Sequence, residues 1–270
     1  MTRILTALVG IPIIFVIVKF LPPEALVVCV AACVVLGCLE LFAIAEAQGY
    51  RPHKLLGAAL GVGAACSFYS GKVSVTQVLC ATAILVPLAS LLRAARGAGP
   101  LDGELAGIGV TFAGVLFVGW LMGYCIGLMG DGAERGRDLT VFLFFVVWLS
   151  DAGAYVVGSL WGKRKLAARI SPGKTVEGVL GALAVAVAAA FVARAWFFRS
   201  LGVGDALALG VLLGGSGVLG DLSESMLKRT AAIKDSGRLF PGHGGMLDRA
   251  DSLLFAGPAL FYYHNYMLGR

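Results

Sequence analysis

Residues 25–46 read ALVVCVAACVVLGCLELFAIAE, with Glu40 and Glu46 as the only charged side chains. About 20 apolar residues in a helix cross the hydrocarbon core of a bilayer, which is roughly 30 Å thick. Eight further apolar runs lie near residues 4–21, 55–71, 74–93, 105–128, 139–160, 176–197, 204–227 and 250–268. The sequence therefore predicts an all-α, polytopic integral membrane protein with about nine transmembrane helices.

The composition agrees with this class. The chain has 270 residues, of which 59% are hydrophobic and 14% charged, whereas soluble domains average about 45–50% and about 25%. These values exclude an ordinary cytosolic domain, a disordered chain and a nucleic-acid binder built on a basic surface. The six cysteines lie in apolar stretches without a CxxC motif, so we expect buried apolar residues and neither disulfides nor zinc ligands.

The positive charges predict the orientation in the membrane. With the N-terminus in the cytoplasm and loops on alternate sides, 15 lysines and arginines fall inside and 7 outside. We expect the run up to Phe20 to be the first transmembrane helix and not a cleaved signal peptide. Residues 1–130 are then N-terminal transmembrane helices that act as a scaffold and a possible dimer region. Residues 131–270 are a C-terminal transmembrane catalytic region with a cytoplasm-facing polar site.

The few charges are concentrated. Of 38 charged residues, 17 lie within residues 151–177 and 221–251, both on the predicted cytoplasmic side. Lysines and arginines there are explained as topology markers, but the carboxylates are not. A carboxylate that adjoins or enters an apolar helix costs several kcal/mol unless it has a partner, a cation or water.

The carboxylates form two pairs. Asp221 and Glu224 share one helical face with Lys228, because the three are spaced i, i+3 and i+7. Asp248 and Asp251 are spaced i, i+3 at the start of the last predicted helix. Paired carboxylates suit a hard cation such as Mg²⁺. Ion pairs with nearby arginines that hold helices together are the alternative.

A glycine-rich loop connects the two pairs, with the sequence KRTAAIKDSGRLFPGHGGMLDRAD over residues 228–251. Such a loop can bring backbone N–H groups close to an anion, and its basic side chains can neutralise phosphates. Between acidic pairs, it indicates a phosphate-plus-metal site at the membrane surface. Within residues 171–178, SPGKTVEG, the run Gly173-Lys174-Thr175 is similar to the end of a P-loop. A P-loop also has a glycine five residues earlier, but residue 168 is alanine. We interpret them as a basic turn that caps the next helix, with Glu177 near the helix N-terminus.

Residues 225–251 follow the pattern Ser225-x-Leu227-Lys228-Arg229-x₄-Lys234-Asp235-x-Gly237-x₂-Phe240-Pro241-x-His243-Gly244-Gly245-x₂-Asp248-Arg249-x-Asp251. This pattern resembles the signature of phosphatidate cytidylyltransferases, also called CDP-diacylglycerol synthases. Two more segments are similar to that family: Ser150-Asp151 with Ala154-Tyr155, and Ser171-Pro172 with Lys174-Thr175-x-Glu177-Gly178. The resemblance covers roughly residues 148–260.

The resemblance implies an enzyme that transfers CMP from CTP to phosphatidic acid and releases pyrophosphate. It implies Mg²⁺ as cofactor, alone or with a second cation. The expected partners are CTP, phosphatidic acid, membrane lipids and, as one option, a second copy of the chain, but no nucleic acid. The expected location is the bacterial inner (plasma) membrane, with the active site facing the cytoplasm.

The resemblance also implies roles for residues. The expected metal ligands are Asp221, Asp248 and Asp251. The expected catalytic residues are these three aspartates together with Lys228 and Arg229. The expected substrate-binding residues are Ser171, Lys174, Thr175, Glu177, Ser225, Lys234, Asp235, His243 and Arg249. Asp151 and Glu224 are further candidates, either as ligands or as buried partners of a lysine.

Three questions stay open at the level of sequence. Glu40 lies inside the second apolar run, where a carboxylate indicates function by default, and a structural bond to another helix explains it equally well. The same chemistry on another lipid phosphate, such as an isoprenoid glycerol ether, would use the same motifs. A transporter or channel is a different class, but the charges cluster at one membrane face and no inverted repeat is visible.

Overall fold

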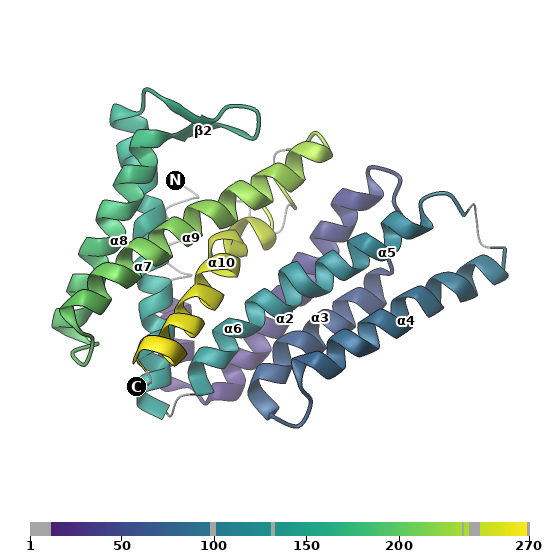
Figure 1. Cartoon of the computed structure of the whole chain (residues 1–270), viewed down its shortest axis with the longest axis horizontal. Helices are drawn as coiled ribbons and strands as arrows, with labels where there is room; N and C mark the ends of the chain where they lie inside the picture. Colours follow the sequence, from purple (N-terminus) through teal and green to yellow (C-terminus); the bar gives the residue numbers. More distant parts are fainter. Residues whose placement is uncertain (1–11, 98–100, 131–132, 234, 238–243, 269–270) are drawn as a thin grey trace.

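Figure 1 shows a computed structural model of the chain, which describes residues 12–97, 101–130, 133–233, 235–237 and 244–268. After a helical segment over residues 12–20, the first part contains α2 (Pro23–Glu46), α3 (Lys54–Ser70), α4 (Val75–Ala95), α5 (Glu104–Ala113), the π-helical η1 (Gly114–Trp120), α6 (Leu121–Gly127) and the short η2 (Leu128–Gly130). The second part contains α7 (Ala133–Trp161), α8 (Val176–Trp196), α9 (Val203–Thr230), α10 (Leu247–Tyr263) and η3 (His264–Leu268).

Within the described residues, six helical stretches are long and apolar enough to cross a membrane: Pro23–Glu46, Val75–Ala95, Glu104–Gly130, Glu134–Trp161, Val176–Trp196 and Val203–Thr230. The prediction of a polytopic membrane protein is therefore confirmed. The predicted runs near 55–71 and 250–268 correspond to the shorter helices α3 and α10, each of 17 residues. Most of the run near 4–21 lies outside the described residues.

The prediction of an all-α fold is wrong in one place. Strands β1 (Lys165–Ala167) and β2 (Ser171–Thr175) form an antiparallel hairpin between α7 and α8, with Lys165 opposite Thr175. Short strands of this kind satisfy their backbone groups only through each other and through water. A hairpin is therefore possible here because it extends beyond the apolar helices (Figure 1).

Contacts between loops place the helix ends on two sides, as the predicted alternation requires. One side has the pairs Arg93 with the Arg51 carbonyl (2.9 Å) and Gln48 with Thr230 (3.2 Å). The other side has the pairs Lys19 with Asp138 (2.5 Å) and Tyr263 with Asp205 (2.8 Å). The hairpin and the end of α9 lie at one end of the molecule, and the α3–α4 turn lies at the other (Figure 1).

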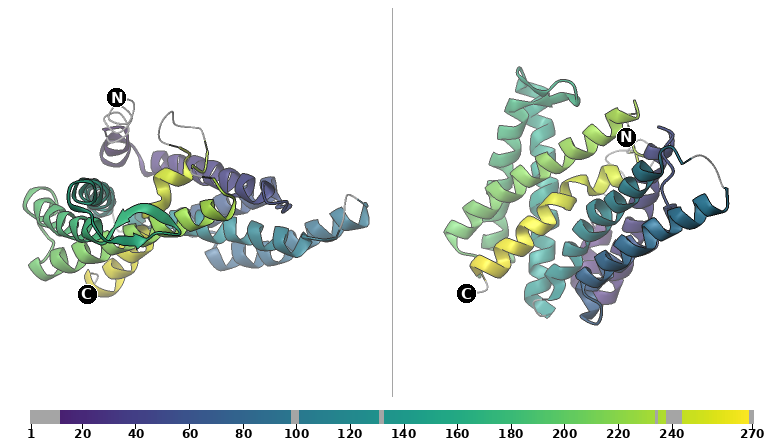
Figure 2. Two further views of the ribbon diagram at one scale, coloured as in Figure 1. Left: turned by 90° about the horizontal axis from the view of Figure 1, so that it is seen from above. Right: turned by 45° about the vertical axis from the view of Figure 1, so that its right-hand side comes forward.

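Helix α10 lies between two groups of helices, because it packs on α9 and also contacts α6 and α2. Figure 2 shows the same arrangement from two further directions. Glycines allow the close approach in the C-terminal group, where a Cβ at Gly210 would collide with the backbone of Val187 on α8. In lipid, such small residues take the place of the hydrophobic effect in bringing helices together.

The cysteines are all free thiols, and the expectation that they are buried holds fully for only two. Cys38 and Cys125 are buried, whereas Cys80 on α4 is exposed. An apolar side chain on a membrane-spanning helix can face lipid without cost, so an apolar sequence context does not predict burial inside the protein.

Candidate active site

A group of three carboxylates lies where α9 meets α10. Asp221 and Glu224 of α9 and Asp251 of α10 each offer a ligand oxygen, and these oxygens lie within 4.8 Å of one another. Glu224 is fully buried, Asp251 is 9% exposed and the Asp221 side chain is 39% exposed. We call Asp221, Glu224 and Asp251 the acidic cluster.

Two glycines of α9 make the cluster sterically possible. A Cβ at Gly220 would collide with the carbonyl oxygen of Asp251, and a Cβ at Gly217 would touch Ser252. The backbone of α10 therefore lies directly on α9 at this point. The Asp251 carboxylate accepts a hydrogen bond from the backbone N–H of Ser252 (2.6 Å), which helps to orient it.

Two lysines contact the acidic cluster. The Nζ atom of Lys174, on β2, lies 2.8 Å from Oδ2 of Asp221, so the hairpin folds over the end of α9. The Nζ atom of Lys228 lies 2.8 Å from Oε2 of Glu224 and 2.5 Å from Oδ1 of Asp248. Both ammonium groups are thus held beside carboxylates, where they can also meet phosphate oxygens.

The charges and the unpaired oxygens fit a divalent cation. Oxygen Oε1 of Glu224 is buried and has no hydrogen-bond partner in the described part of the chain. The side chains in this region include five carboxylates and two lysines: Asp151, Asp221, Glu224, Asp248, Asp251, Lys174 and Lys228. A buried carboxylate oxygen without a partner is costly, and a set of carboxylate oxygens is what Mg²⁺ prefers. The donor set therefore fits Mg²⁺.

Asp248, the third predicted metal ligand, is held by donors from the loop before α10. Its Oδ2 atom lies 2.8 Å from each of three donors: the backbone N–H of Ser236, the hydroxyl of Ser236 and the backbone N–H of Gly245. Asp248 lies in the first turn of α10, where a carboxylate turns back toward free N–H groups. The structure therefore places Glu224, and not Asp248, in a three-carboxylate group with Asp221 and Asp251.

Glu40 reaches the same region from α2. Its Oε1 accepts from the backbone N–H of Met246 (2.8 Å), and its Oε2 accepts from the N–H of Leu247 (2.9 Å). Oε2 also lies 2.8 Å from the Ser236 hydroxyl, whose one proton Glu40 shares with Asp248. Sequence reasoning singled out Glu40 but not Ser236. A hydroxyl in a glycine-rich loop between acidic residues was the available signal for Ser236.

The sequence profile of the cytidylyltransferase family matches residues 1–267. This chain belongs to the cytidylyltransferase family. It is 46% identical over 139 residues to the phosphatidate cytidylyltransferase of Haemophilus influenzae, a match that covers 50% of this chain and 48% of the relative. It is 36% identical over 193 residues to the phosphatidate cytidylyltransferase of Synechocystis sp., covering 61% and 64%.

A third relative is the "Uncharacterized protein YnbB" of Escherichia coli, 36% identical over 191 residues, or 68% of this chain and 63% of that protein. The matched part of the chain thus spans about half to two thirds of the length of these relatives. All three matches agree with the family.

Two of the predicted substrate-binding residues, Thr175 and Glu177, hold the hairpin and the start of α8. The Thr175 hydroxyl accepts from the N–H of Gly178 (3.1 Å) and caps α8. Glu177 accepts from the N–H of Lys163 (3.0 Å) and of Arg164 (3.1 Å), which ties the start of the hairpin to α8. The predicted cap of this helix is confirmed, although the preceding residues form strand β2 and not a simple turn.

Arg229 and Ser225 also make intramolecular contacts. Arg229 donates to the carbonyls of Ile170 in the hairpin and of Ile233 after α9, each at 3.0 Å. The Ser225 hydroxyl donates to Oδ1 of Asp221 (3.3 Å). The Arg229 contacts connect the end of α9 to the hairpin and to the chain that follows, whereas the Ser225 contact lies within α9 beside the acidic cluster.

Four of the remaining predicted residues lie in the described part of the chain. Ser171 belongs to β2 opposite Ala167, and Asp151 on α7 accepts from the Ser252 hydroxyl (3.4 Å). Asp235 and Arg249 are exposed. Lys234 and His243 lie outside the described residues.

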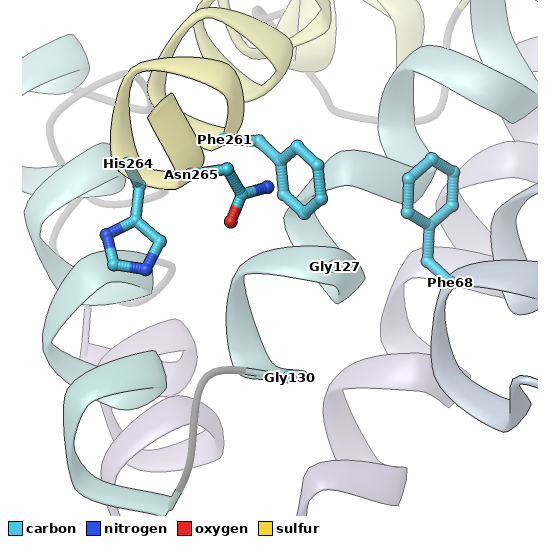
Figure 3. A pocket seen from close by; sticks show the side chains of 6 residues that line it. All are labelled: Phe68, Gly127, Gly130, Phe261, His264 and Asn265. Carbon is cyan, nitrogen blue, oxygen red and sulfur yellow. The ribbon is translucent and has the colours of Figure 1, made fainter. Parts of the chain in front are cut away.

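A separate pocket lies at the other end of α10. Figure 3 shows its lining, which comprises Phe68, Gly127, Gly130, Phe261, His264 and Asn265. Asp251 and His264 are 13 positions apart along the helical segment, which corresponds to about 20 Å. The pocket is therefore distinct from the acidic cluster.

Proposed function

We propose that this cytidylyltransferase transfers CMP from CTP to phosphatidic acid, giving CDP-diacylglycerol and pyrophosphate. The observation that carries the proposal is the acidic cluster with the ammonium groups of Lys174 and Lys228 beside it. Two relatives named phosphatidate cytidylyltransferase support the lipid substrate. The proposal places the site at the cytoplasmic face of a bacterial inner membrane.

The chemistry explains why a site without a dedicated base suffices. An oxygen of the lipid phosphate attacks the α-phosphorus of CTP, and a new P–O bond forms. The bond from the α-phosphorus to the bridging oxygen breaks, and pyrophosphate leaves with the electron pair. The attacking phosphate is already ionised at neutral pH. Catalysis therefore depends on bringing two polyanions together and neutralising their charge.

Asp221, Glu224 and Asp251 would hold Mg²⁺, alone or with a second cation, which when bound offsets negative charge on the reacting phosphates. Lys174 and Lys228 now pair with carboxylates, and each can exchange that partner for a phosphate oxygen of a substrate. Asp248 acts in this proposal by holding Lys228, and Arg229 by holding the hairpin that carries Lys174.

The overall organisation belongs to the same proposal. The proposal includes nine transmembrane helices. Residues 1–130 form a scaffold and a possible homodimer region, and residues 131–270 form the catalytic region. This arrangement would leave the acidic cluster at one membrane face. The loop contacts support it, since residues 48, 51, 93 and 230 lie on one side.

The test supplies the purified protein in mixed micelles with α-labelled CTP, Mg²⁺ and phosphatidic acid. We expect labelled lipid and equimolar pyrophosphate. Asp251→Asn, which keeps the size of the side chain and removes its charge, should lower turnover by about 100-fold or more. Asp102→Asn, at an exposed carboxylate before α5, is the matched control and should match the wild type.

Assays with two different lipid phosphates separate the two candidate substrates. Labelled product with an isoprenoid glycerol ether phosphate but not with phosphatidic acid would move the proposal to that lipid. The absence of both lipid-linked CMP and pyrophosphate would overturn it. Full turnover in Asp251→Asn would remove Asp251 from the cation site.

A further inference from the structure

The start of α10 is capped by a residue of another helix. The first N–H groups of any helix lack partners within the helix, and the side chain of Met246, at the N-cap position, provides none. Glu40 of α2 provides them instead, since its two carboxylate oxygens accept from the N–H of Met246 (2.8 Å) and of Leu247 (2.9 Å). A negative charge is favoured at this position by the helix dipole.

Glu40 also contacts Ser236, which lies within the glycine-rich loop of residues 228–251. The hydroxyl of Ser236 lies 2.8 Å from Oε2 of Glu40 and 2.8 Å from Oδ2 of Asp248. Ser236 comes six residues after the last residue of α9, whereas Met246 and Leu247 begin α10. Glu40 therefore joins the chain that leaves α9 to the chain that enters α10.

Two glycines of the loop leave space for the Glu40 carboxylate. A Cβ at Gly237 or at Gly245 would collide with that carboxylate, so glycine at both positions leaves room for Glu40 in the orientation that the structure shows. Gly244, with φ at 80°, adopts a left-handed conformation that favours glycine for a different reason. Hydrogen bonds and sterics thus point to the same side chain independently.

We propose that Glu40 is a positioning residue for cytidylyl transfer, which caps α10 and so fixes Asp248 and Asp251. The inference rests on the proposed function for the reaction, but its structural part does not. Asp248 lies one residue after the capped Leu247 and holds Lys228, and Asp251 lies one turn further, in the acidic cluster. The cost of a carboxylate in an apolar helix is offset by the hydrogen bonds from Met246 and Leu247 and by the Ser236 hydroxyl that Glu40 shares with Asp248.

The experiment compares Glu40→Gln, Glu40→Asp and the control Glu46→Gln. Glutamine keeps the length of the side chain, but its NH₂ group faces backbone donors and cannot accept from them. Aspartate keeps the charge on a shorter side chain. Glu46 is on the same helix, with a 41% exposed side chain paired to Lys54, and so matches the charge change without the cap.

Two readouts are measured on the full-length protein. For Glu40→Gln we expect kcat to fall by about 10- to 100-fold with a smaller change in the KM for CTP, because the reacting groups are misplaced and not removed. Hydrogen–deuterium exchange of the amides of Met246 and Leu247 should accelerate by about tenfold. Glu40→Asp should recover part of the lost kcat and part of the lost amide protection, and Glu46→Gln should match the wild type in both.

Each outcome decides a part of the inference. Unchanged amide exchange in Glu40→Gln would overturn the cap. Faster amide exchange in Glu40→Gln with an unchanged kcat would overturn the positioning role. A loss of kcat in Glu40→Gln that is explained by a lower thermal unfolding temperature, and that Glu40→Asp does not recover, would overturn it as well. If the wild type fails to use CTP with either lipid phosphate, the proposed function and the positioning role both fall, while amide exchange still decides the cap.

Discussion

Lys228 is held between carboxylates from two different helices. Its ammonium group contacts Glu224 on the same helix and Asp248 on α10, and its side chain is only 11% exposed. A buried charge of this kind is tolerated because it is paired, and removing one partner leaves the others uncompensated. Lys228 therefore contributes to stability as well as to the proposed phosphate contacts.

A double-mutant comparison tests this role. Lys228→Met should destabilise the protein by about 3–5 kcal/mol, because it leaves two buried carboxylates facing each other. Adding Glu224→Gln should recover part of that loss, since it removes one uncompensated charge. Thermal unfolding of the purified variants in detergent measures both effects. A double variant that is less stable than Lys228→Met would contradict the pairing.

The sequence predicts part of this arrangement. The helical period alone places Asp221, Glu224 and Lys228 on one face, as the structure confirms. The different environments of Asp248 and Asp251 depend on where α10 begins, which spacing does not reveal. The contact between Glu40 and Leu247 joins residues 207 positions apart, and no local pattern records it.

At the scale of elements, the approach of α9 to α10 decides the geometry of the site. Gly220, which precedes Asp221 in the sequence, lies against the backbone of Asp251. Any side chain at position 220 must push the two helices apart. Gly215, on the same helix, has open space around it. Two glycines of one helix thus differ in whether they determine the distance between the carboxylates.

Alanine substitutions use this difference. Gly220→Ala should lower turnover by about 10- to 100-fold and raise the Mg²⁺ concentration needed for half-maximal rate, because Asp251 moves away from Asp221. Gly215→Ala should leave both values unchanged. Rates measured over a range of Mg²⁺ concentrations provide the comparison. Equal behaviour of the two variants would show that the approach of the helices does not set the cation site.

The hairpin shows where element prediction fails. The cap at Thr175 and the acidic first turn of α8 follow from residue types at a helix start. The strands do not, because β1 and β2 have three and five residues and no alternating pattern. Strands this short exist through pairing with each other, which residue types within either strand do not specify.

At the scale of the whole molecule, the loops divide between two sides. The structure confirms the separation through contacts such as Arg93 with Arg51 and Lys19 with Asp138. The distribution of positive charge predicts which side faces the cytoplasm.

Single cysteines in a variant without the six native ones test the orientation. Lys165→Cys, in the hairpin, should react with a membrane-impermeant maleimide only in inside-out vesicles. Lys72→Cys, in the α3–α4 turn, should react only in right-side-out vesicles. Both positions are exposed. Labelling of both from the same side would contradict the two-sided arrangement, and exchanged sides would reverse the orientation.

The length of α9 has a consequence for how the reaction depends on the membrane. Asp221 lies 18 positions after Val203, or about 27 Å along a helix, close to the roughly 30 Å thickness of the hydrocarbon core. Under the proposed function, the acidic cluster therefore meets a lipid phosphate at the depth where that phosphate already resides. Encounter with this substrate is two-dimensional, so its surface concentration, and not its bulk concentration, sets the rate. The liponucleotide stays in the plane of the bilayer and can diffuse laterally to the next enzyme without entering water.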